Sequence, residues 1–412
     1  MDILRFITAG SVDDGKSTLI GRLLYDSKSI LQDQLEVLEK HSKNKNEDGV
    51  DLALLTDGLR AEREQGITID VAYRYFSTPK RKFIIADAPG HVQYTRNMIT
   101  GASNSDLMVI LIDARKGVIE QTRRHSIIAS LLQLKKVAVA INKMDMVEYS
   151  KEVFETIKAD YAKIADSLGL KDVSYFPISA LKGDNIVSVS SQTDWYEGSS
   201  LLEYLEQVTL HEELNTGSRF QVQYVIRPQT EELHDYRGYA GQILSGQFRK
   251  GDKIHILPAG LTTEIAKIEI NGTEQDLAVE GQPAVIHTTH DLDISRGDLF
   301  TTEEQVPTVE KDLEVLLCWL DQKSLQPGNK YLLQQNSRLV KAVVKEVDYK
   351  INVNTLIQEK AEGEIKLNEI VKVTLRTAQP LVYDRFINNK KTGSAILVDE
   401  TSNSTVAACI IQ

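Results

Sequence analysis

The stretch GSVDDGKST, residues 10–18, follows the apolar run ILRFITA near the start of the chain, and its glycines, lysine and first hydroxyl fill the pattern G-x-x-x-x-G-K-[ST]. Glycines at this spacing let backbone N–H groups turn inward around a phosphate. The lysine bridges the β- and γ-phosphates, and the hydroxyl coordinates Mg²⁺. We therefore predict a nucleoside triphosphate site at the start of a helix, whose positive end would face the phosphates. The predicted contacts are Gly10, Ser11, Val12, Asp13, Asp14, Gly15, Lys16, Ser17 and Thr18.

Two further segments could sense the γ-phosphate. DAPGH follows the apolar run KFIIA, so Asp87 is placed to hold Mg²⁺ through a water molecule, and the Gly90 amide can reach the γ-phosphate. His91 follows that glycine, and we expect it to orient the attacking water rather than to be a surface or capping residue. Upstream, Thr68 in EREQGITID could supply a hydroxyl to Mg²⁺ and make this loop a switch. The predicted catalytic residues are His91, Lys16 and Thr68, and the predicted Mg²⁺ ligands are Ser17, Thr68 and Asp87.

A third group of residues could select the base. In AINKMD, Asp145 can accept hydrogen bonds from N1–H and the exocyclic amine of guanine, a donor pair that adenine lacks. Asn142 would tie this segment to the phosphate loop, and the Lys143 stem would cover the base. In SALKGDN, the Ala180 amide could meet guanine O6. Four such segments in this order, each after an apolar run, predict a GTP site. Its base contacts are expected from Asn142, Lys143, Asp145, Ser179, Ala180 and Leu181.

The elements that must position these loops read as an α/β domain. Near-continuous apolar runs fit strands that are buried on both faces of a parallel sheet, and they occupy residues 3–8, 82–87, 106–113 and 135–142. Residues 151–168 have helical periodicity, with an apolar stripe at Val153, Ile157, Tyr161, Ile164 and Leu168. Strand and helix in alternation predict a doubly wound, mostly parallel sheet. STPKRK, residues 77–82, reads as an exposed turn between two strands.

The pattern changes near residue 215, where apolar and polar residues begin to alternate between turn signals such as RGYAG and EINGTEQ. This alternation predicts antiparallel β-barrels. We expect a boundary between two of them in the polar stretch TTEEQVPTVEK. We expect a nucleotide-binding domain over 1–214 and β-barrel domains over 215–308 and 309–412.

The composition sets limits on the class of protein. A chain of 412 residues suggests two to three domains, and a formal net charge of −11 disfavours nucleic acid as the main partner. Cys318 and Cys409 do not have the spacing of a metal-binding motif. We expect both to be buried apolar core residues, which suits a reducing compartment. With neither a signal-peptide pattern nor 18 consecutive apolar residues, no membrane is expected and the cytoplasm is the predicted location.

GSVDDGKST, EREQGITID, DAPGH, NKMD and SALKGDN together resemble the signatures of the translation-factor class of GTPases. The resemblance implies a GTP-binding domain followed by two β-barrels. It also implies that Asp13 matches an acidic residue associated with a monovalent cation, and that His91 matches the histidine that positions the hydrolytic water. Asp14 departs from the histidine that is common there in elongation factors.

The sequence between these signature motifs is similar to one branch of that class, the GTPase subunit of the two-subunit bacterial sulfate adenylyltransferase. VAYRYFSTPKRKFIIAD and QYTRNM carry much of this similarity, whereas Ala88 stands where the branch often has threonine. The resemblance implies a partner catalytic subunit, in a heterodimer or higher assembly, that forms adenosine 5′-phosphosulfate and pyrophosphate from ATP and sulfate. GTP hydrolysis on this chain would drive that uphill first step of sulfate assimilation.

The main alternative is an elongation factor of the Tu/1-alpha type that delivers aminoacyl-tRNA. It would share the fold, the nucleotide and every site residue named above. The sequence between the signature motifs favours the sulfate adenylyltransferase branch over an elongation factor.

Overall fold

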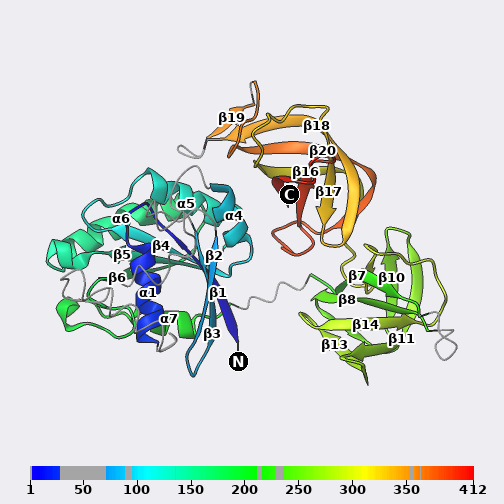
Figure 1. The fold of residues 1–412 in the computed structure, drawn as a ribbon, viewed down its shortest axis with the longest axis horizontal. Helices are drawn as coiled ribbons and strands as arrows, with labels where there is room; N and C mark the ends of the chain where they lie inside the picture. The colour runs from blue at the N-terminus through cyan, green and yellow to red at the C-terminus, as the bar shows by residue number, and fades with distance from the viewer. Residues whose placement is uncertain are drawn as a thin grey trace. The chain divides into compact units, whose positions relative to one another are not determined.

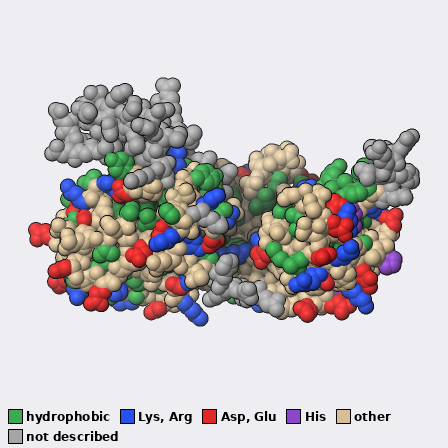
Figure 2. Space-filling view, turned by 90° about the horizontal axis from the view of Figure 1, so that it is seen from below, with side chains coloured by type: hydrophobic (Ala, Val, Ile, Leu, Met, Phe, Trp, Pro, Cys, Tyr) green, Lys and Arg blue, Asp and Glu red, His purple; other side chains and the backbone are tan. Residues whose placement is uncertain are grey.

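The computed structural model describes residues 2–27, 71–88, 95–134, 136–210, 216–228, 236–352, 357–361 and 363–412. Thr68, Gly90 and His91 lie outside these ranges. The chain divides into two compact units, with the change at residues 211 and 212 (Figure 1). None of the helices in the described parts is long and apolar enough to cross a membrane. Acidic and basic side chains are interspersed over the described parts of the face in Figure 2.

The first unit is built on a sheet of six described strands in the order β2-β3-β1-β4-β5-β6. All neighbours pair in parallel except β2, which runs antiparallel to β3. The strands are β1 (Ile3–Ala9), β2 (Ala72–Ser77), β3 (Lys82–Asp87), β4 (Leu107–Asp113), β5 (Lys136–Asn142) and β6 (Asp172–Pro177). The helices are α1 (Lys16–Asp26), α4 (Thr95–Ser103), α5 (Glu120–Leu131), α6 (Lys151–Ser167) and α7 (Leu201–Gln207), with 3₁₀ turns η3 (Met144–Val147) and η4 (Ser191–Thr193). The predicted mostly parallel α/β sheet is confirmed.

The apolar runs form the strands because both faces of the sheet are covered. Every residue of β4 is buried, as the continuous run of apolar residues predicts. Helices α1 and α7 pack into one core with alternate residues of the strands, while α4, α5 and α6 lie next to one another (Figure 1). This layering brings the loops after β1, β3, β5 and β6 to the carboxyl edge of the sheet, where open α/β sheets bind ligands.

Helix α6 spans almost the predicted range, but its buried stripe is rotated. Phe154, Ile157, Tyr161 and Ala165 are buried, whereas the predicted Val153, Ile164 and Leu168 are half-buried. The Phe154 ring packs on Trp195, with centroids 5.2 Å apart, so this side of the helix lies against the segment after β6.

The turn between β2 and β3 is not exposed throughout, and the prediction for residues 77–82 is wrong at Arg81. This side chain is buried and donates to the Leu205 and Val208 carbonyl oxygens at 3.0 and 2.8 Å. It also pairs with Asp2 at 2.5 Å. Arg81 therefore supplies hydrogen-bond partners for the end of α7.

The second unit contains two closed antiparallel β-barrels, as predicted. The first follows the cyclic order β10-β15-β7-β8-β14-β11, with β12 (Thr273–Gln275) added outside and β9 (Gln247–Arg249) paired with β13 (Leu277–Val279). Its barrel strands are β7 (Arg219–Ile226), β8 (Gly238–Ser245), β10 (Lys253–Leu257), β11 (Leu261–Ile270), β14 (Pro283–Thr288) and β15 (Leu299–Thr301). Phenylalanine and isoleucine side chains fill its core.

The second barrel follows the cyclic order β17-β21-β22-β16-β20-β18, with β19 (Gln358–Lys360) added outside. Its barrel strands are β16 (Thr308–Trp319), β17 (Lys330–Gln335), β18 (Arg338–Ile351), β20 (Ile370–Tyr383), β21 (Ser394–Val398) and β22 (Thr405–Ile411). Trp319 is wholly buried in its core, and Cys318 and Cys409 are buried, unpaired thiols. The two cysteines agree with their predicted structural role.

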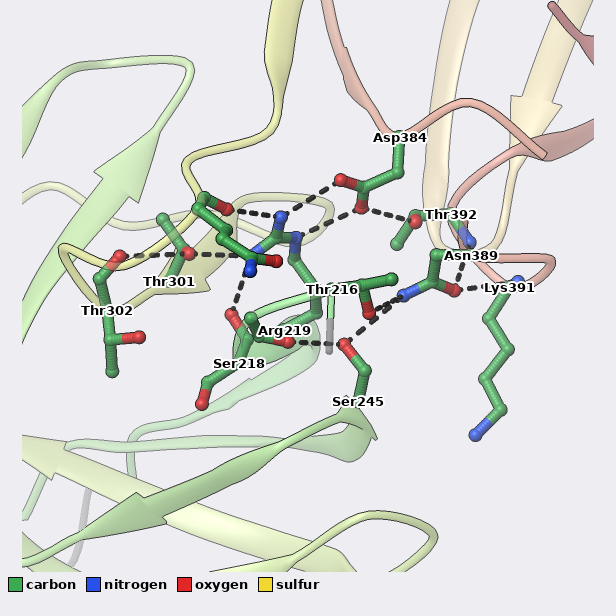
Figure 3. A network of polar contacts seen from close by, with 12 residues as sticks. Thr216, Ser218, Arg219, Ser245, Thr301, Thr302, Asp384, Asn389, Lys391 and Thr392 are labelled. Atoms are coloured by element: carbon green, nitrogen blue, oxygen red, sulfur yellow. Dashed lines mark hydrogen bonds and ion pairs between the residues drawn. The ribbon is translucent and has the colours of Figure 1, made fainter. Parts of the chain in front are cut away.

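A buried polar network joins the two barrels, and Arg219 lies at its centre (Figure 3). Its guanidinium contacts both carboxylate oxygens of Asp384, at 2.9 and 3.0 Å. The remaining N–H groups donate to the Ser218 and Gln305 carbonyl oxygens and to the Thr301 hydroxyl. All five donors of a side chain that is 1% exposed are thus used.

Candidate nucleotide-binding site

The phosphate loop joins β1 to α1 and is organised around Lys16. The Nζ atom of Lys16 donates to the Gly10 and Ser11 carbonyl oxygens at 2.9 and 3.0 Å, which holds the ammonium inside the loop. Burial lowers the pKa of Lys16, and the carboxylates of Asp87 and Asp14 oppose that effect. The predicted phosphate-binding amine is therefore anchored, and a bound anion would favour its charged form further.

Gly15 closes the loop and begins the helix. Its φ of +93° lies in the left-handed region, and a Cβ there would come within 2.4 Å of Asn142 Nδ2. Only glycine fits this backbone without strain. No side chain caps the N-terminus of α1, and its first turn contains no acidic residue. The free N–H groups at this end suit a phosphate ligand.

Asp14, which departs from the elongation-factor pattern, is buried in the phosphate loop. Its Oδ2 accepts a hydrogen bond from the Ser11 amide at 2.6 Å, whereas Oδ1 has no hydrogen-bond partner among the described residues. Burial raises the pKa of Asp14, although the Ser11 amide works in the opposite direction. The Asp14 carboxylate thus stabilises the conformation of the phosphate loop through its hydrogen bond with the Ser11 amide.

The predicted Mg²⁺ ligands in the described ranges lie on neighbouring elements. Ser17 is in the first turn of α1, and Asp87 ends β3, where its Oδ1 accepts from the Thr8 hydroxyl at 3.3 Å. Mg²⁺ prefers oxygen ligands and is commonly held by one or two carboxylates together with substrate phosphates. A hydroxyl and a buried carboxylate beside a phosphate loop fit that requirement. Within the described residues, no group of three or more His, Cys, Asp or Glu side chains could hold a metal ion.

Asn142 connects the predicted base-binding loops to the phosphate loop. Its Nδ2 donates to the Asp14 carbonyl oxygen at 2.7 Å, and its Oδ1 accepts from the Ala180 amide at 2.9 Å. The expectation that Asn142 ties the two loops together agrees with this geometry. The Ala180 amide is directed at Asn142, so its contact with guanine O6 stays a prediction.

Asp145 and Lys143 lie on either side of the start of η3. The Ser179 hydroxyl donates to Asp145 Oδ1 at 2.7 Å, which orients the carboxylate predicted to read guanine. Lys143 Nζ donates to the Asp13 carbonyl oxygen at 2.5 Å and pairs with Asp113 at 3.0 Å. The Leu181 side chain is exposed. The structure thus brings the described residues of the phosphate and base segments together, whereas Thr68, Gly90 and His91 lie outside the described ranges.

Sequence reasoning missed two residues of this site. Asp113 ends β4 and accepts from Arg115 and Lys143; burial opposes its ionisation, but these bonds outweigh burial and hold its pKa below the ordinary value. Arg22 on α1 donates to the Leu181 carbonyl oxygen at 2.7 Å. The position of Asp113 directly after an apolar run was a usable signal, because Asp87 has the same position. Nothing in the sequence marks Arg22.

The chain is similar to known proteins along its whole length. A family model described as elongation factor Tu GTP binding domain matches residues 1–212, and one described as GTP-eEF1A C-terminal domain-like matches residues 312–412. The chain is 50% identical to the bifunctional enzyme CysN/CysC of Mycobacterium tuberculosis, over 99% of this chain and 67% of that protein. It is 50% and 48% identical to sulfate adenylyltransferase subunit 1 of Cellvibrio japonicus and Bacteroides fragilis, over 100% of this chain and 86% of each relative. Among solved structures, Sup35 complexed with GMPPNP matches with 22% identity and a TM-score of 0.45, over 100% of this chain and 93% of that one.

Proposed function

The chain belongs to the sulfate adenylyltransferase subunit 1 family, with an elongation factor Tu GTP binding domain at residues 1–212, and on this premise we propose that it is the GTP-hydrolysing subunit of a sulfate adenylyltransferase. The observation that carries the proposal is the double hydrogen bond of Asn142 to Asp14 and Ala180. It joins a phosphate loop to a base-reading loop in one site. The domain limits at residues 214 and 308 and the cytoplasmic location are part of the proposal.

Within this proposed site, different residues bind the phosphates, the base and Mg²⁺. Lys16 and the N–H groups at the start of α1 bind and orient the phosphates, while Asp145, oriented by Ser179, selects guanine over adenine. Ser17 and Asp87 would hold Mg²⁺, with Thr68 as a further ligand, and the ion would neutralise charge that develops on the phosphates. The Gly90 amide would detect the γ-phosphate, and His91 would orient the attacking water.

We further infer a partner, because the relatives are named as subunit 1 of an enzyme. A separate catalytic subunit would bind ATP and sulfate and form adenosine 5′-phosphosulfate and pyrophosphate. That reaction is uphill, since the phosphosulfate anhydride is high in energy, and GTP cleavage on this chain would supply the driving force. Delivery of aminoacyl-tRNA is less well supported, because the two elongation-factor domain models match single domains, whereas the relatives named sulfate adenylyltransferase subunit 1 match over the full length of this chain.

Titration calorimetry of the isolated chain tests the nucleotide assignment. We expect GDP and GTP to bind with Mg²⁺ present and ADP and ATP to bind at least 10²-fold more weakly, because adenine leaves the Asp145 carboxylate without its donor pair. Equal affinities for GTP and ATP would contradict the proposal.

A further inference from the structure

We propose that Tyr149 and Asp184 are positioning residues that brace the two base-reading loops and thereby set how well the site recognises the exocyclic amine of guanine. This inference rests on the proposed GTP site and adds residues that neither the sequence motifs nor the comparisons assign. The brace consists of Tyr149, Asp184, Ser190 and Trp195, all from the described part of the first unit.

The centre of the brace is the Asp184 carboxylate. Tyr149 Oη donates to its Oδ2 at 2.5 Å, and the Ser190 hydroxyl donates to its Oδ1 at 2.6 Å. Asp184 is half-buried, and both of its carboxylate oxygens are used. Hydrogen bonds to a charged acceptor are among the stronger ones in proteins. The residue is therefore held from two directions, by the segment after NKMD and by the segment after SALKGDN.

The backbone of Asp184 passes this restraint to Ser179. The two residues form an antiparallel bridge, in which the Ser179 amide donates to the Asp184 carbonyl oxygen at 3.2 Å. The Gly183 amide donates in turn to the Ser179 carbonyl oxygen at 2.8 Å. The Ser179 hydroxyl then donates to Asp145 Oδ1 at 2.7 Å. A continuous path thus runs from the Tyr149 hydroxyl to the Asp145 carboxylate, the group proposed to read the base.

Tyr149 is itself fixed from both sides. It has a φ of +53°, and its amide donates to the Met144 carbonyl oxygen at 2.8 Å, which closes the turn that contains Asp145. Its carbonyl oxygen accepts from Trp195 Nε1 at 2.9 Å. Burial raises the pKa of Tyr149, and the neighbouring Asp184 raises it further, so the hydroxyl remains a donor at neutral pH.

The closed path has a chemical consequence for base recognition. Tyr149 and Asp145 belong to the same turn, yet they are joined a second time through Asp184 and Ser179. Removing the Tyr149 hydroxyl leaves the Asp184 carboxylate with one side-chain donor and frees the loop that orients Asp145. The contact most sensitive to that freedom is the one between Asp145 and the exocyclic amine of guanine. The Asp145 carboxylate can accept from both guanine donors only when its plane is aligned with the base, and its second oxygen is the one that meets the exocyclic amine.

Inosine diphosphate, which lacks the exocyclic amine, isolates this contact. In the full chain, Tyr149→Phe and Asp184→Asn are expected to lower the affinity for GDP by about 3- to 10-fold, as loss of one hydrogen bond implies. The affinity for inosine diphosphate should change less than twofold, so the ratio of the two affinities falls. Tyr161→Phe is a matched control, since its hydroxyl bonds Ser126 at 2.9 Å, away from both loops.

The control variant is expected to lower the melting temperature while leaving the affinity ratio unchanged. Native ratios in both Tyr149→Phe and Asp184→Asn would overturn the inference while leaving the proposed function intact. A native chain that binds GDP no better than ADP would overturn the proposed function, and the inference would fall with it.

Discussion

Asn142 donates from its side-chain amide to the Asp14 carbonyl oxygen at 2.7 Å, across 128 positions of the sequence. The same side chain accepts from the Ala180 amide, so one buried residue links the loops after β1, β5 and β6. In the proposed site, such a link would make phosphate binding and base binding depend on one another. The phosphate loop cannot move away from the base-reading loops without breaking a buried hydrogen bond.

Asn142→Ala removes both bonds and leaves two buried backbone groups without partners. Because each unsatisfied group costs about 1–3 kcal/mol, the loops should rearrange in the free chain, and restoring their arrangement on binding should lower the affinity for GDP by about 10²-fold. Equilibrium titration with GDP measures this directly. Asn389→Ala, which removes a buried asparagine from the second unit, is the control and should leave GDP affinity within threefold. A native affinity in Asn142→Ala would contradict the role of the link.

His91→Ala tests the water-positioning role that the sequence predicts for a residue outside the described ranges. Loss of a group that orients the attacking water is expected to slow GTP cleavage by about 10²-fold or more while GTP affinity is unchanged. Single-turnover kinetics separates cleavage from binding and release. An unaltered cleavage rate would remove His91 from the mechanism.

His125 on α5 predicts a specific pH dependence of stability. The imidazole is buried, and burial, with the positive charges of Lys16 and Arg124, lowers its pKa to about 3. In the unfolded chain its pKa is about 6.5, so as the pH falls below that value the unfolded state takes up a proton that the folded state does not. Stability is therefore lost from about pH 7 towards pH 4, and His125 contributes no pH dependence above about pH 7.5.

We expect the melting temperature of the native chain to fall more steeply between pH 7 and pH 5 than that of His125→Gln, which cannot be protonated. Thermal unfolding followed by circular dichroism across that range provides the comparison. Parallel curves for the two proteins would show that His125 is not the group responsible.

The ion pair between Arg219 and Asp384 is expected to stabilise the second unit because the guanidinium donates hydrogen bonds to both carboxylate oxygens. Arg219→Met leaves the mostly buried Asp384 carboxylate with only the Thr392 hydroxyl as a side-chain donor, and such a break costs about 3–5 kcal/mol. The double variant Arg219→Met/Asp384→Leu should lose less, because it removes the isolated charge. Lys163→Ala, from an exposed pair with Asp160, should change the free energy of unfolding by less than about 1 kcal/mol. Chemical denaturation that gives equal values for Arg219→Met and Lys163→Ala would contradict this.

The sequence was sufficient to predict an element or a site residue where burial or a fixed backbone conformation restricts which residue types can occupy the position. Apolar runs identified β3, β4 and β5, since strands buried on both faces admit little else, and Gly15 could be expected because only glycine tolerates its conformation. The contacts of Arg81, Tyr149 and Asp184 could not be predicted, because each depends on a polar partner that only the folded chain brings close. Helix α6 shows the same limit: periodicity predicts an apolar stripe, but contacts with distant residues, such as Phe154 with Trp195 and Tyr161 with Tyr175, accompany the residues that are buried.

Coupling between GTP cleavage and sulfate activation is best measured as the formation of adenosine 5′-phosphosulfate. The chain is combined with its catalytic partner subunit, ATP, sulfate and pyrophosphatase, and product is followed with and without GTP. We predict that GTP raises the yield of product and is cleaved as product forms, and that Asn142→Ala lowers both together. Equal product with and without GTP would contradict the coupling, and protection of aminoacyl-tRNA from deacylation by the chain would point to the elongation-factor alternative instead.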